Sequence, residues 1–451
     1  MRWIYLNHSI RKYSKHVNRF HVGIVGAGPA GFYCAQQLLK KIPDCQIDIY
    51  ERLPVPFGLV RYGVAPDHPE VKNVINTFTK TASNKNVRFI GNVSLGCDIT
   101  LAQLKYSYNA IVLAYGADED KKLNIAGENL SNVLSATKFI GWYNGLPANK
   151  NIKVDLDVEH AVIVGQGNVA LDVARILLTP IDELRKTDIT EYSLETLTQS
   201  KVKKVTLIGR RGPLQVAFTI KEFREMLKLP GVSTNFFENQ INDINKIISD
   251  LPRPRRRLIQ LMYDASQQIE VRNKSFDLLF LRTPISILGN TKMEGIELAI
   301  NHLEGEKAVV TDDKYTLKCD IAFRSIGYRS VQADPDVPFN KISSTVPQSI
   351  GIYSVGWLSS GPVGVILSTM SNAFQAASLI GQHFDKGLLS EQKAGYNYIS
   401  KVLKDKGIVT VDWDGWMRID KVEVERGIKH GKPREKIVNI DEMLQIGGIL
   451  K

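Results

Sequence analysis

The sequence predicts an α/β protein of two related units, because one strand–glycine–helix pattern occurs twice in it. Apolar runs at 22–25 and 161–164 are typical of buried parallel strands. The first is followed by GAGPAG at 26–31 and the second by GQGNVA at 165–170. A glycine turn between such a strand and a helix is the Rossmann-like dinucleotide-binding pattern. One copy is weak evidence, whereas two copies indicate that two dinucleotides meet in this molecule.

The first glycine turn carries the residue types that a pyrophosphate site requires. Gly26 permits the tight turn, Gly28 lets the backbone approach the phosphates, and Gly31 allows close packing of helix on strand. A helix over 29–41 would direct its N-terminal N–H groups at the phosphates. The next strand ends at Glu51, where a carboxylate accepts a ribose hydroxyl and repels a 2′-phosphate. This site is therefore predicted to hold FAD or NAD and not NADP.

The segments after Glu51 complete the first unit. Residues 54–69 are too rich in Pro and Gly for a helix, and they are predicted to form a long loop that lines a ligand. Residues 70–82 are predicted to be helical. Strands are predicted at 87–91 and 110–115.

The second glycine turn differs from the first in the charge that follows it. A helix is predicted from 170 to 178, and the polar segment 181–200 is expected to be a surface insertion. A strand at 204–208 is followed by Arg210 and Arg211, whose guanidinium groups suit a 2′-phosphate through charge-assisted hydrogen bonds. With an acid at one site and an arginine pair at the other, we expect FAD in the first site and NADPH in the second.

Composition argues against several other classes. The 451 residues are enough for two or three domains. They contain no run of about eighteen apolar residues, which a transmembrane helix would need. Four scattered cysteines, without a C-x-x-C pair, argue against a redox dithiol, an iron–sulfur cluster and a zinc site. The same cysteine pattern fits a reducing compartment.

Two segments concentrate the positive charge. The formal net charge is +11, and the acid-free residues 1–20 supply five of these charges. This basic segment with scattered apolar residues is predicted to be a mitochondrial presequence, the alternative being a disordered basic tail. The second segment is Arg-Pro-Arg-Arg-Arg at 253–257, and a helix is predicted to begin near Arg257. No nucleic-acid motif accompanies it, so an acidic protein is the better candidate partner.

The last third of the chain is predicted to return to the first unit. A strand within 318–328 ends the second unit, and a buried strand at 351–357 precedes a helix over roughly 365–384. The aromatic stretch 412–416 is expected to belong to a covering subdomain without chemistry of its own. The predicted domains are a presequence at 1–20, the first part of an FAD domain at 21–118, an inserted NADP domain at 119–338, and the second part of the FAD domain with its C-terminal subdomain at 339–451.

The chain resembles the mitochondrial NADPH:adrenodoxin (ferredoxin) oxidoreductase family in several long motifs. They are VGIVGAGPAGFY, VPFGLVRYGVAPDHPEVK, VIVGQGNVALDVARILL, GRRGPLQVAFTIKE, RPRRRL, RSIGY and GWLSSGPVGVI, and they run in the family's order from about residue 21 to about residue 370. Other two-dinucleotide flavoproteins usually have Gly-Asp where this chain has Gly356-Trp357. The family shares that departure.

This resemblance implies a set of functional residues. Those for FAD are Gly26, Gly28, Pro29, Ala30, Gly31, Glu51, Leu59, Val93, Trp357, Gly364, Val365 and Ile366. Those for NADP are Gln166, Gly167, Asn168, Val169, Arg210, Arg211, Glu222 and Gly364. His68 and Asp172 are implied as polar groups near the flavin or the partner, with a purely structural role as the alternative. Arg253 and Arg257 are implied as residues that dock the partner, with a merely solvated basic face as the alternative.

The resemblance also implies the reaction. NADPH would pass a hydride to a tightly but non-covalently bound FAD, and electrons would then leave singly to an acidic mitochondrial [2Fe–2S] ferredoxin, adrenodoxin. This electron supply serves P450 steroid hydroxylation or iron–sulfur cluster assembly in the family. The expected protein is a monomer of the mitochondrial matrix, without metal or nucleic acid, and a peripheral contact with the inner membrane stays open. The alternatives are an FAD- and NADPH-dependent monooxygenase, another two-dinucleotide flavoprotein such as a disulfide reductase, and a non-catalytic nucleotide sensor.

Overall fold

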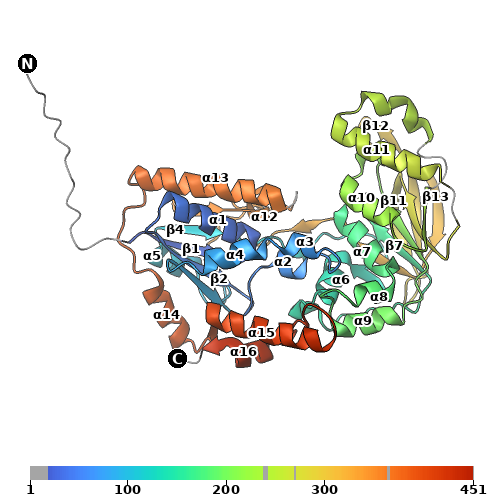
Figure 1. Cartoon of the computed structure of the whole chain (residues 1–451). Helices are drawn as coiled ribbons and strands as arrows, with labels where there is room; N and C mark the ends of the chain where they lie inside the picture. The colour runs from blue at the N-terminus through green and yellow to red at the C-terminus, as the bar shows by residue number, and fades with distance from the viewer. Residues whose placement is uncertain (1–18, 237–241, 269–270, 363–365, 450–451) are drawn as a thin grey trace, which may run out of the picture.

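Two α/β units stand side by side in the computed structural model (Figure 1). The structure describes residues 19–236, 242–268, 271–362 and 366–449. Residues 1–18 of the predicted presequence therefore lie outside the described part. Each unit is built on its own largely parallel sheet, as the repeated strand–glycine–helix pattern predicts. No helix in the described ranges has the length and apolarity that a membrane span requires.

The first unit is organised around a seven-stranded sheet of order β16-β4-β1-β2-β3-β17-β18. β1 pairs in parallel with β2 and β4, and β4 pairs in parallel with β16, so the carboxyl ends of these strands meet at one edge. The strands are β1 (His21–Val25), β2 (Gln46–Glu51), β3 (Val87–Gly91), β4 (Ala110–Leu113), β16 (Ile352–Ser354), β17 (Thr410–Val411) and β18 (Gly448–Ile449).

Helices cover both faces of this sheet. On one face, α13 (Ile366–Asp385) lies along α1 (Pro29–Lys41) (Figure 1), and the rings of Tyr33 and Phe374 meet edge to face at 6.1 Å. The other face is covered by α5 (Leu101–Ser107) and α14 (Tyr396–Asp405). α1 begins with Pro29, whose fixed φ suits a first helical position.

Two sequence-based predictions for this unit need correction. The loop 54–69 contains a short helix, α2 (Leu59–Tyr62), because Gly58 turns the chain at a φ of 46° and the buried Arg61 and Tyr62 anchor the turn. The predicted helix over 70–82 is two helices, α3 (Pro69–Lys72) and α4 (Ile75–Ala82).

The second unit has a six-stranded, fully parallel sheet of order β6-β14-β7-β8-β10-β9. An antiparallel meander, β11-β12-β13, packs against one face of it through apolar side chains such as Ile296 and Leu298. The strands are β6 (Val133–Ser135), β7 (His160–Val164), β8 (Lys204–Ile208), β9 (Val232–Phe236), β10 (Lys274–Leu279), β11 (Arg282–Leu288), β12 (Gly295–Glu304), β13 (Lys307–Lys318) and β14 (Ile321–Arg324).

The helices of the second unit differ from the prediction in two places. The segment 181–200 is not a surface insertion, because Leu184, Ile189 and Leu194 are buried in the core of the unit. Its helices are α8 (Ile181–Leu184) and α9 (Glu191–Thr198), and the others are α6 (Ala136–Tyr143), α7 (Asn168–Leu178), α10 (Ile220–Leu227) and α11 (Arg253–Ser266). α11 begins at Arg253 and not near Arg257, because Pro254 is tolerated in the first helical turn.

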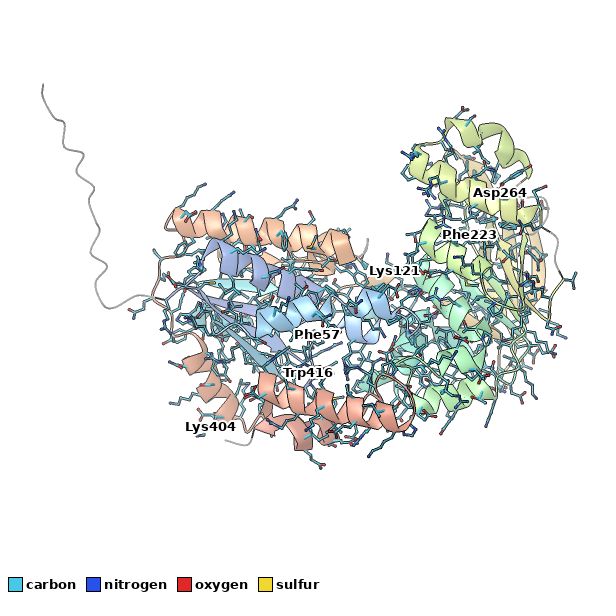
Figure 2. The ribbon with its side chains drawn as sticks, viewed as in Figure 1. Phe57, Lys121, Phe223, Asp264, Lys404 and Trp416 are labelled. Carbon is cyan, nitrogen blue, oxygen red and sulfur yellow. The ribbon has the colours of Figure 1, made fainter. Side chains whose placement is uncertain are left out.

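The two units are joined by a small ribbon and by the C-terminal segment. β5 (Glu119–Asp120) pairs antiparallel with β15 (Tyr328–Arg329) where the chain leaves and re-enters the first unit. β17 and β18 extend the first sheet, and α15 (Trp413–Lys429) and α16 (Ile440–Gly447) pack below it. The ring centroids of Phe57 and Trp416 lie 5.7 Å apart in this packing (Figure 2).

Candidate functional site: two dinucleotide turns and a junction cluster

The first glycine turn lies at the carboxyl edge of the first sheet. Gly26 has a φ of 112°, and a Cβ there would lie 2.5 Å from the carbonyl oxygen of Ala114, which follows β4. A Cβ at Gly31 would lie 2.1 Å from the Gly26 oxygen, so both positions require glycine. A Cβ at Gly28 would meet nothing within 4 Å. Position 28 therefore faces open space that a pyrophosphate can approach.

The second turn repeats this geometry in the other unit. Gly165 has a φ of 130°, and a Cβ there would lie 2.1 Å from the oxygen of Ser325, which follows β14. A Cβ at Gly167 would again meet nothing within 4 Å. The Gln166 amide donates to the Leu279 oxygen across Gly209. Each turn is thus held against the neighbouring parallel strand and is open at its middle glycine.

Both turns lead into helices whose first N–H groups have no side-chain cap. Gly28 is the N-cap of α1 and Gly167 is the N-cap of α7, and neither helix has an acid in its first turn. By contrast, the hydroxyls of Thr100 and Thr219 accept hydrogen bonds at the starts of α5 and α10. Uncapped N–H groups and the helix dipole favour an anion such as a phosphate.

The Glu51 carboxylate is held against the first turn. Its Oε2 accepts the Ala27 N–H at 3.0 Å, and its Oε1 accepts the Leu53 N–H at 3.2 Å. Burial raises the pKa of Glu51, while Arg52 and these N–H groups counteract the rise. The buried Val93 N–H donates to the Glu51 backbone oxygen at 2.9 Å. The acid is therefore fixed beside the turn.

The arginine pair after β8 is exposed. The Arg210 carbonyl accepts from the Asn301 amide at 2.7 Å, and the Arg211 carbonyl accepts from the Leu281 N–H at 3.2 Å. Neither guanidinium has a hydrogen-bond or ion-pair partner among the described residues. The backbone of the pair is thus fixed, while both cationic groups are available to an anionic ligand.

The remaining residues that the resemblance implies lie at the starts of helices in the two units. Asn168 begins α7, and its Oδ1 accepts the Thr219 N–H at 2.8 Å. Val169 is partly buried against the core of the second unit, and Ala30 is buried in the first turn of α1. Leu59 is exposed and begins α2.

The Trp357 segment follows β16 at the same edge of the first sheet. A Cβ at Gly356 would lie 2.8 Å from the Ala30 Cβ, so this segment runs beside the start of α1. Trp357 begins α12 (Trp357–Ser360), and its ring lies 5.3 Å from that of Tyr328 on the connecting ribbon. Gly364 and Val365 lie outside the described residues, and only the backbone of Ile366, the first residue of α13, is described.

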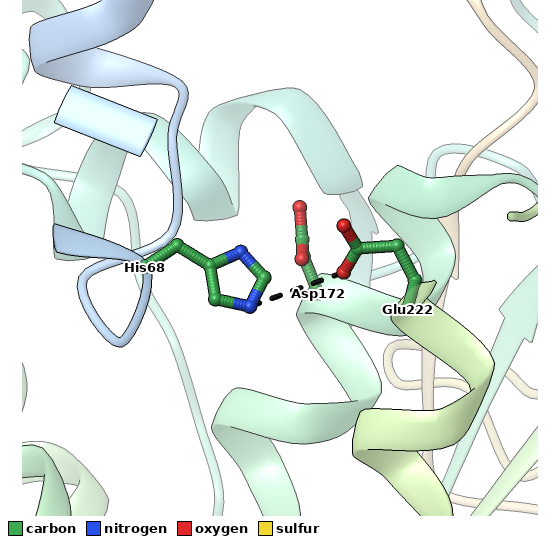
Figure 3. A group of neighbouring side chains, drawn as sticks. All are labelled: His68, Asp172 and Glu222. Carbon is green, nitrogen blue, oxygen red and sulfur yellow. Dashed lines mark ion pairs between the residues drawn. The ribbon is translucent and has the colours of Figure 1, made fainter. Parts of the chain in front are cut away.

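A polar cluster joins the two units (Figure 3). His68 comes from the loop between α2 and α3, Asp172 from α7 and Glu222 from α10, and one polar atom of each lies within 4.8 Å of the others. The His68 Nε2 is 4.0 Å from Glu222 Oε2 and 2.7 Å from Glu225 Oε2. Burial raises the pKa of Asp172, and Arg175 counteracts this effect. Burial and the nearby Asp172 raise the pKa of Glu222.

Arg175 is the central residue that the sequence analysis missed. Its side chain is 3% exposed, and its guanidinium lies 2.6 Å from Asp172, 2.5 Å from Asp67 and 3.3 Å from Glu222. Burial acts to lower the pKa of Arg175, but Asp172 and Asp67 outweigh it and raise the pKa. The sequence did contain one indication of this role: Asp172 and Arg175 are three residues apart on one helix, a spacing that allows an ion pair.

The predicted docking arginines lie on the exposed side of α11. Arg253 and Arg257 are both exposed. Arg255 and Arg256 instead donate to backbone oxygens of Val216 and Leu251. The neighbouring α10 segment adds exposed Arg224 and Lys228, which the sequence analysis did not single out.

Two open glycine turns before uncapped helices, one beside an acid and one beside a free arginine pair, define a two-dinucleotide protein. The turns belong to different units that meet at the Tyr328–Trp357 contact and at the His68 cluster. A flavin in one unit facing a pyridine nucleotide in the other is the arrangement of an oxidoreductase.

The comparisons with known proteins place the chain within this class. Residues 20–235 match the pyridine nucleotide-disulphide oxidoreductase family model. The chain is 47% identical to the mitochondrial NADPH:adrenodoxin oxidoreductase of Salvelinus fontinalis, with 94% of this chain and 90% of that protein covered. The human enzyme of the same name is 46% identical, over 94% and 91%. Mycobacterium tuberculosis FprA in complex with NADPH superposes with a TM-score of 0.91 at 35% identity, over 95% and 99%.

The chain therefore belongs to the NADPH:adrenodoxin oxidoreductase family. The predicted two-dinucleotide α/β fold and the predicted oxidoreductase class are confirmed. FAD as the cofactor and NADPH as the co-substrate are confirmed with them.

Proposed function

We propose that this protein is a mitochondrial NADPH:ferredoxin reductase that takes a hydride from NADPH onto FAD and passes electrons singly to an acidic [2Fe–2S] ferredoxin, adrenodoxin. The observation that carries this proposal is the opposite charge at the two turns. Glu51 is fixed beside the first turn, whereas Arg210 and Arg211 are free beside the second. FAD supplies the chemistry that links a two-electron donor to a one-electron acceptor.

The residues of the first unit suit FAD. The open position at Gly28 and the uncapped start of α1 fit a pyrophosphate, and Glu51 fits a ribose. We assign the flavin end to the Trp357 segment, because that segment runs beside the start of α1 at the same sheet edge. On this basis, 21–118 and 339–451 form the FAD domain.

The residues of the second unit suit NADPH. Gly167 and the first turn of α7 fit its pyrophosphate, while Gln166 and Asn168 hold the turn in shape. Arg210 and Arg211 fit the 2′-phosphate. On this basis, the inserted segment 119–338 forms the NADP domain.

The junction cluster suits proton handling. Each NADPH oxidised by two one-electron acceptors releases one proton, which an acid–base group of the protein can pass to solvent. Asp172 and Glu222 have raised pKa values because of burial, and His68 is hydrogen-bonded to Glu225 at 2.7 Å. We assign His68 and Asp172 to this role, with Arg175 as the residue that orients Asp172.

The exposed basic side of α11 suits an acidic partner. The cationic groups of Arg253 and Arg257 donate to no carbonyl of the described residues, unlike those of Arg255 and Arg256. Such a patch would speed the encounter with an acidic ferredoxin. The proposed setting is the mitochondrial matrix, with a monomeric protein, no nucleic acid and at most a peripheral contact with the inner membrane.

An anaerobic titration tests the proposed function directly. The purified protein should be yellow, and one equivalent of NADPH should bleach the flavin absorbance, whereas the same amount of NADH should bleach it much more slowly. A mitochondrial ferredoxin added afterwards should restore the oxidised spectrum and become reduced. A colourless protein, or a flavin that NADPH leaves oxidised, would exclude the proposal. Re-oxidation by air with oxygenation of an added substrate would favour a monooxygenase.

A further inference from the structure

The C-terminal segment crosses the junction between the two units. α15 starts below the first sheet and ends beside the second unit, close to α8 and α9 (Figure 1). The chain then passes along the second unit, where a Cβ at Gly145 would lie 3.2 Å from Val438 and 3.3 Å from Lys436. The aromatic start of α15 therefore belongs to the first unit and the segment after it contacts the second.

One buried carboxylate ties three distant parts of the chain together. Asp188, between α8 and α9, accepts from the Lys72 Nζ at 2.6 and 2.8 Å and lies 3.1 Å from the Lys436 Nζ. Lys72 belongs to α3 in the first unit, and Lys436 follows α15. Only 12% of the Lys72 side chain, 12% of the Asp188 side chain and 1% of the Lys436 side chain is exposed. We call these three residues the junction clamp.

Further buried contacts anchor the C-terminal segment on either side of this clamp. Glu423 of α15 is fully buried and pairs with Arg61 of the first unit, and it also accepts the Ile437 N–H at 2.9 Å. Lys432 lies 3.3 Å from Glu191 at the start of α9. The segment is therefore attached to both units by ion pairs in which at least one partner is buried.

Buried charge contacts restrict geometry more strongly than apolar ones. If the units rotate, an apolar contact can slide, whereas a displaced carboxylate leaves buried charges unpaired. Burial lowers the pKa of Lys436 to about 7 even though Asp188 counteracts it, so this site is strongly desolvated. The contacts of the clamp therefore favour one relative orientation of the two units.

We propose that the junction clamp of Lys72, Asp188 and Lys436 fixes the angle between the two units and thereby positions the nicotinamide against the flavin. This inference rests on the proposed function, because it assumes that the two dinucleotides are held by different units. Hydride transfer needs reacting atoms within about 3 to 3.5 Å, and a misplacement of about 1 Å can cost about a hundredfold in rate. The three residues are positioning residues, since none of them belongs to either glycine turn or to the arginine pair after β8.

Two variants and a control test this role. Asp188→Asn keeps the size of the side chain but removes the charge that both lysines share. Asp188→Asn leaves the buried Lys436 ammonium group without its carboxylate partner, which could impair folding. The double variant Asp188→Asn/Lys436→Met removes that ammonium group as well, so it replaces the single variant if the single variant folds poorly. The control is Glu442→Gln, which breaks a 2.5 Å ion pair with Arg426 between α15 and α16 that includes no residue of the clamp. FAD content and circular dichroism report whether each variant is folded.

The first readout is the rate of flavin reduction at saturating NADPH in a stopped-flow instrument. We expect a fall of about 10- to 100-fold in the clamp variants. The Kd for NADPH should change by less than about threefold, since about 0.6 kcal/mol is within ordinary surface effects. The Glu442→Gln control should match the wild type. Unchanged rates in a folded clamp variant overturn the proposal.

The second readout is the distance between the units. Spin labels at Lys80→Cys on α4 and Glu195→Cys on α9, both exposed positions, are placed in a Cys97→Ser background. The distance distribution should be narrow in the otherwise unaltered protein and broad in the clamp variants. A lower rate with an unchanged distribution also overturns the proposal. If NADPH fails to reduce the wild-type flavin, the proposed function fails instead, and the spin-label distances still report whether the clamp holds the units.

Discussion

The two arginines after β8 carry the nucleotide preference at the scale of single residues. Replacing both Arg210 and Arg211 by Ala should raise the KM for NADPH at least about 100-fold, because each charge-assisted bond to the 2′-phosphate is worth about 1.5 to 3 kcal/mol and two such bonds are lost. The KM for NADH should change little, since the 2′-phosphate is the only difference between the two nucleotides. Steady-state kinetics with both nucleotides measure the ratio of the KM for NADH to the KM for NADPH.

The matched control for this prediction is Arg52→Ala. Arg52 is also exposed and also follows the second strand of a glycine-turn unit, but it pairs with Asp118 in the first unit. The Arg52→Ala substitution should leave the ratio of the two KM values unchanged. Equal losses for NADPH and NADH in the double variant would mean that the arginine pair supports the fold of the turn and does not bind the phosphate.

Residues at strand ends could be predicted from the sequence, whereas the junction cluster could not. Glu51 ends one strand that the apolar pattern identifies and Arg210 follows another, and parallel strands bring their carboxyl ends to one edge. The pairing of His68 with Glu225 depends on a loop of one unit meeting a helix of the other, 157 residues later in the chain. No local pattern encodes that contact. Arg175 was missed because it lies in a largely apolar helix, where a buried cation is unexpected.

At the scale of elements, α11 is a helix with two kinds of arginine. Reversing the two exposed ones that make no backbone hydrogen bond through the guanidinium to a described residue, Arg253→Glu/Arg257→Glu, should lower kcat/KM for the ferredoxin about 10- to 100-fold by weakening its attraction to this face. Direct reduction of menadione, a neutral acceptor, should stay unchanged because the flavin and the NADPH site are not altered. Cytochrome c reduction through ferredoxin, compared with menadione reduction, measures the two activities.

Lys401→Glu/Lys404→Glu provides a control with the same change in net charge. Both lysines are exposed on α14, far from α11 at the opposite end of the molecule (Figures 1 and 2). This variant should keep more than about half of the ferredoxin activity, since exposed charges far from a docking face act weakly through screening solvent. A similar loss in both variants would assign the effect to overall charge and not to α11.

Element predictions failed where tertiary packing outweighs local composition. The segment 181–200 is polar in composition, yet its few apolar side chains are enough to seat α8 and α9 in the core. The segment 54–69 is rich in Pro and Gly, yet the contacts of Arg61 and Tyr62 stabilise one helical turn within it. α1, α7 and the strands before them were predicted closely, because their apolar runs and glycine turns are local signals.

At the scale of the whole molecule, the C-terminal segment changes the interpretation of the architecture. Sequence patterns indicate two nucleotide units but give no information on the angle between them. Glu423 and Asp188 provide that information, and both lie in segments that the sequence analysis regarded as a covering subdomain or a surface insertion. A reaction between two ligands that are bound to different units needs both binding sites and a fixed orientation of one unit relative to the other.

The charge of the whole molecule makes ferredoxin turnover dependent on salt. Without the five charges of residues 1–20, the formal net charge is +6. This charge attracts an acidic partner only over about one Debye length. The Debye length falls from about 10 Å at 0.1 M salt to about 3 Å at 1 M salt. At saturating NADPH, kcat/KM for ferredoxin should fall about tenfold over this range, while menadione reduction stays level. Arg253→Glu/Arg257→Glu should flatten the dependence. If the variant keeps the wild-type slope at a lower rate, the long-range attraction comes from elsewhere on the surface, and α11 contributes only at contact.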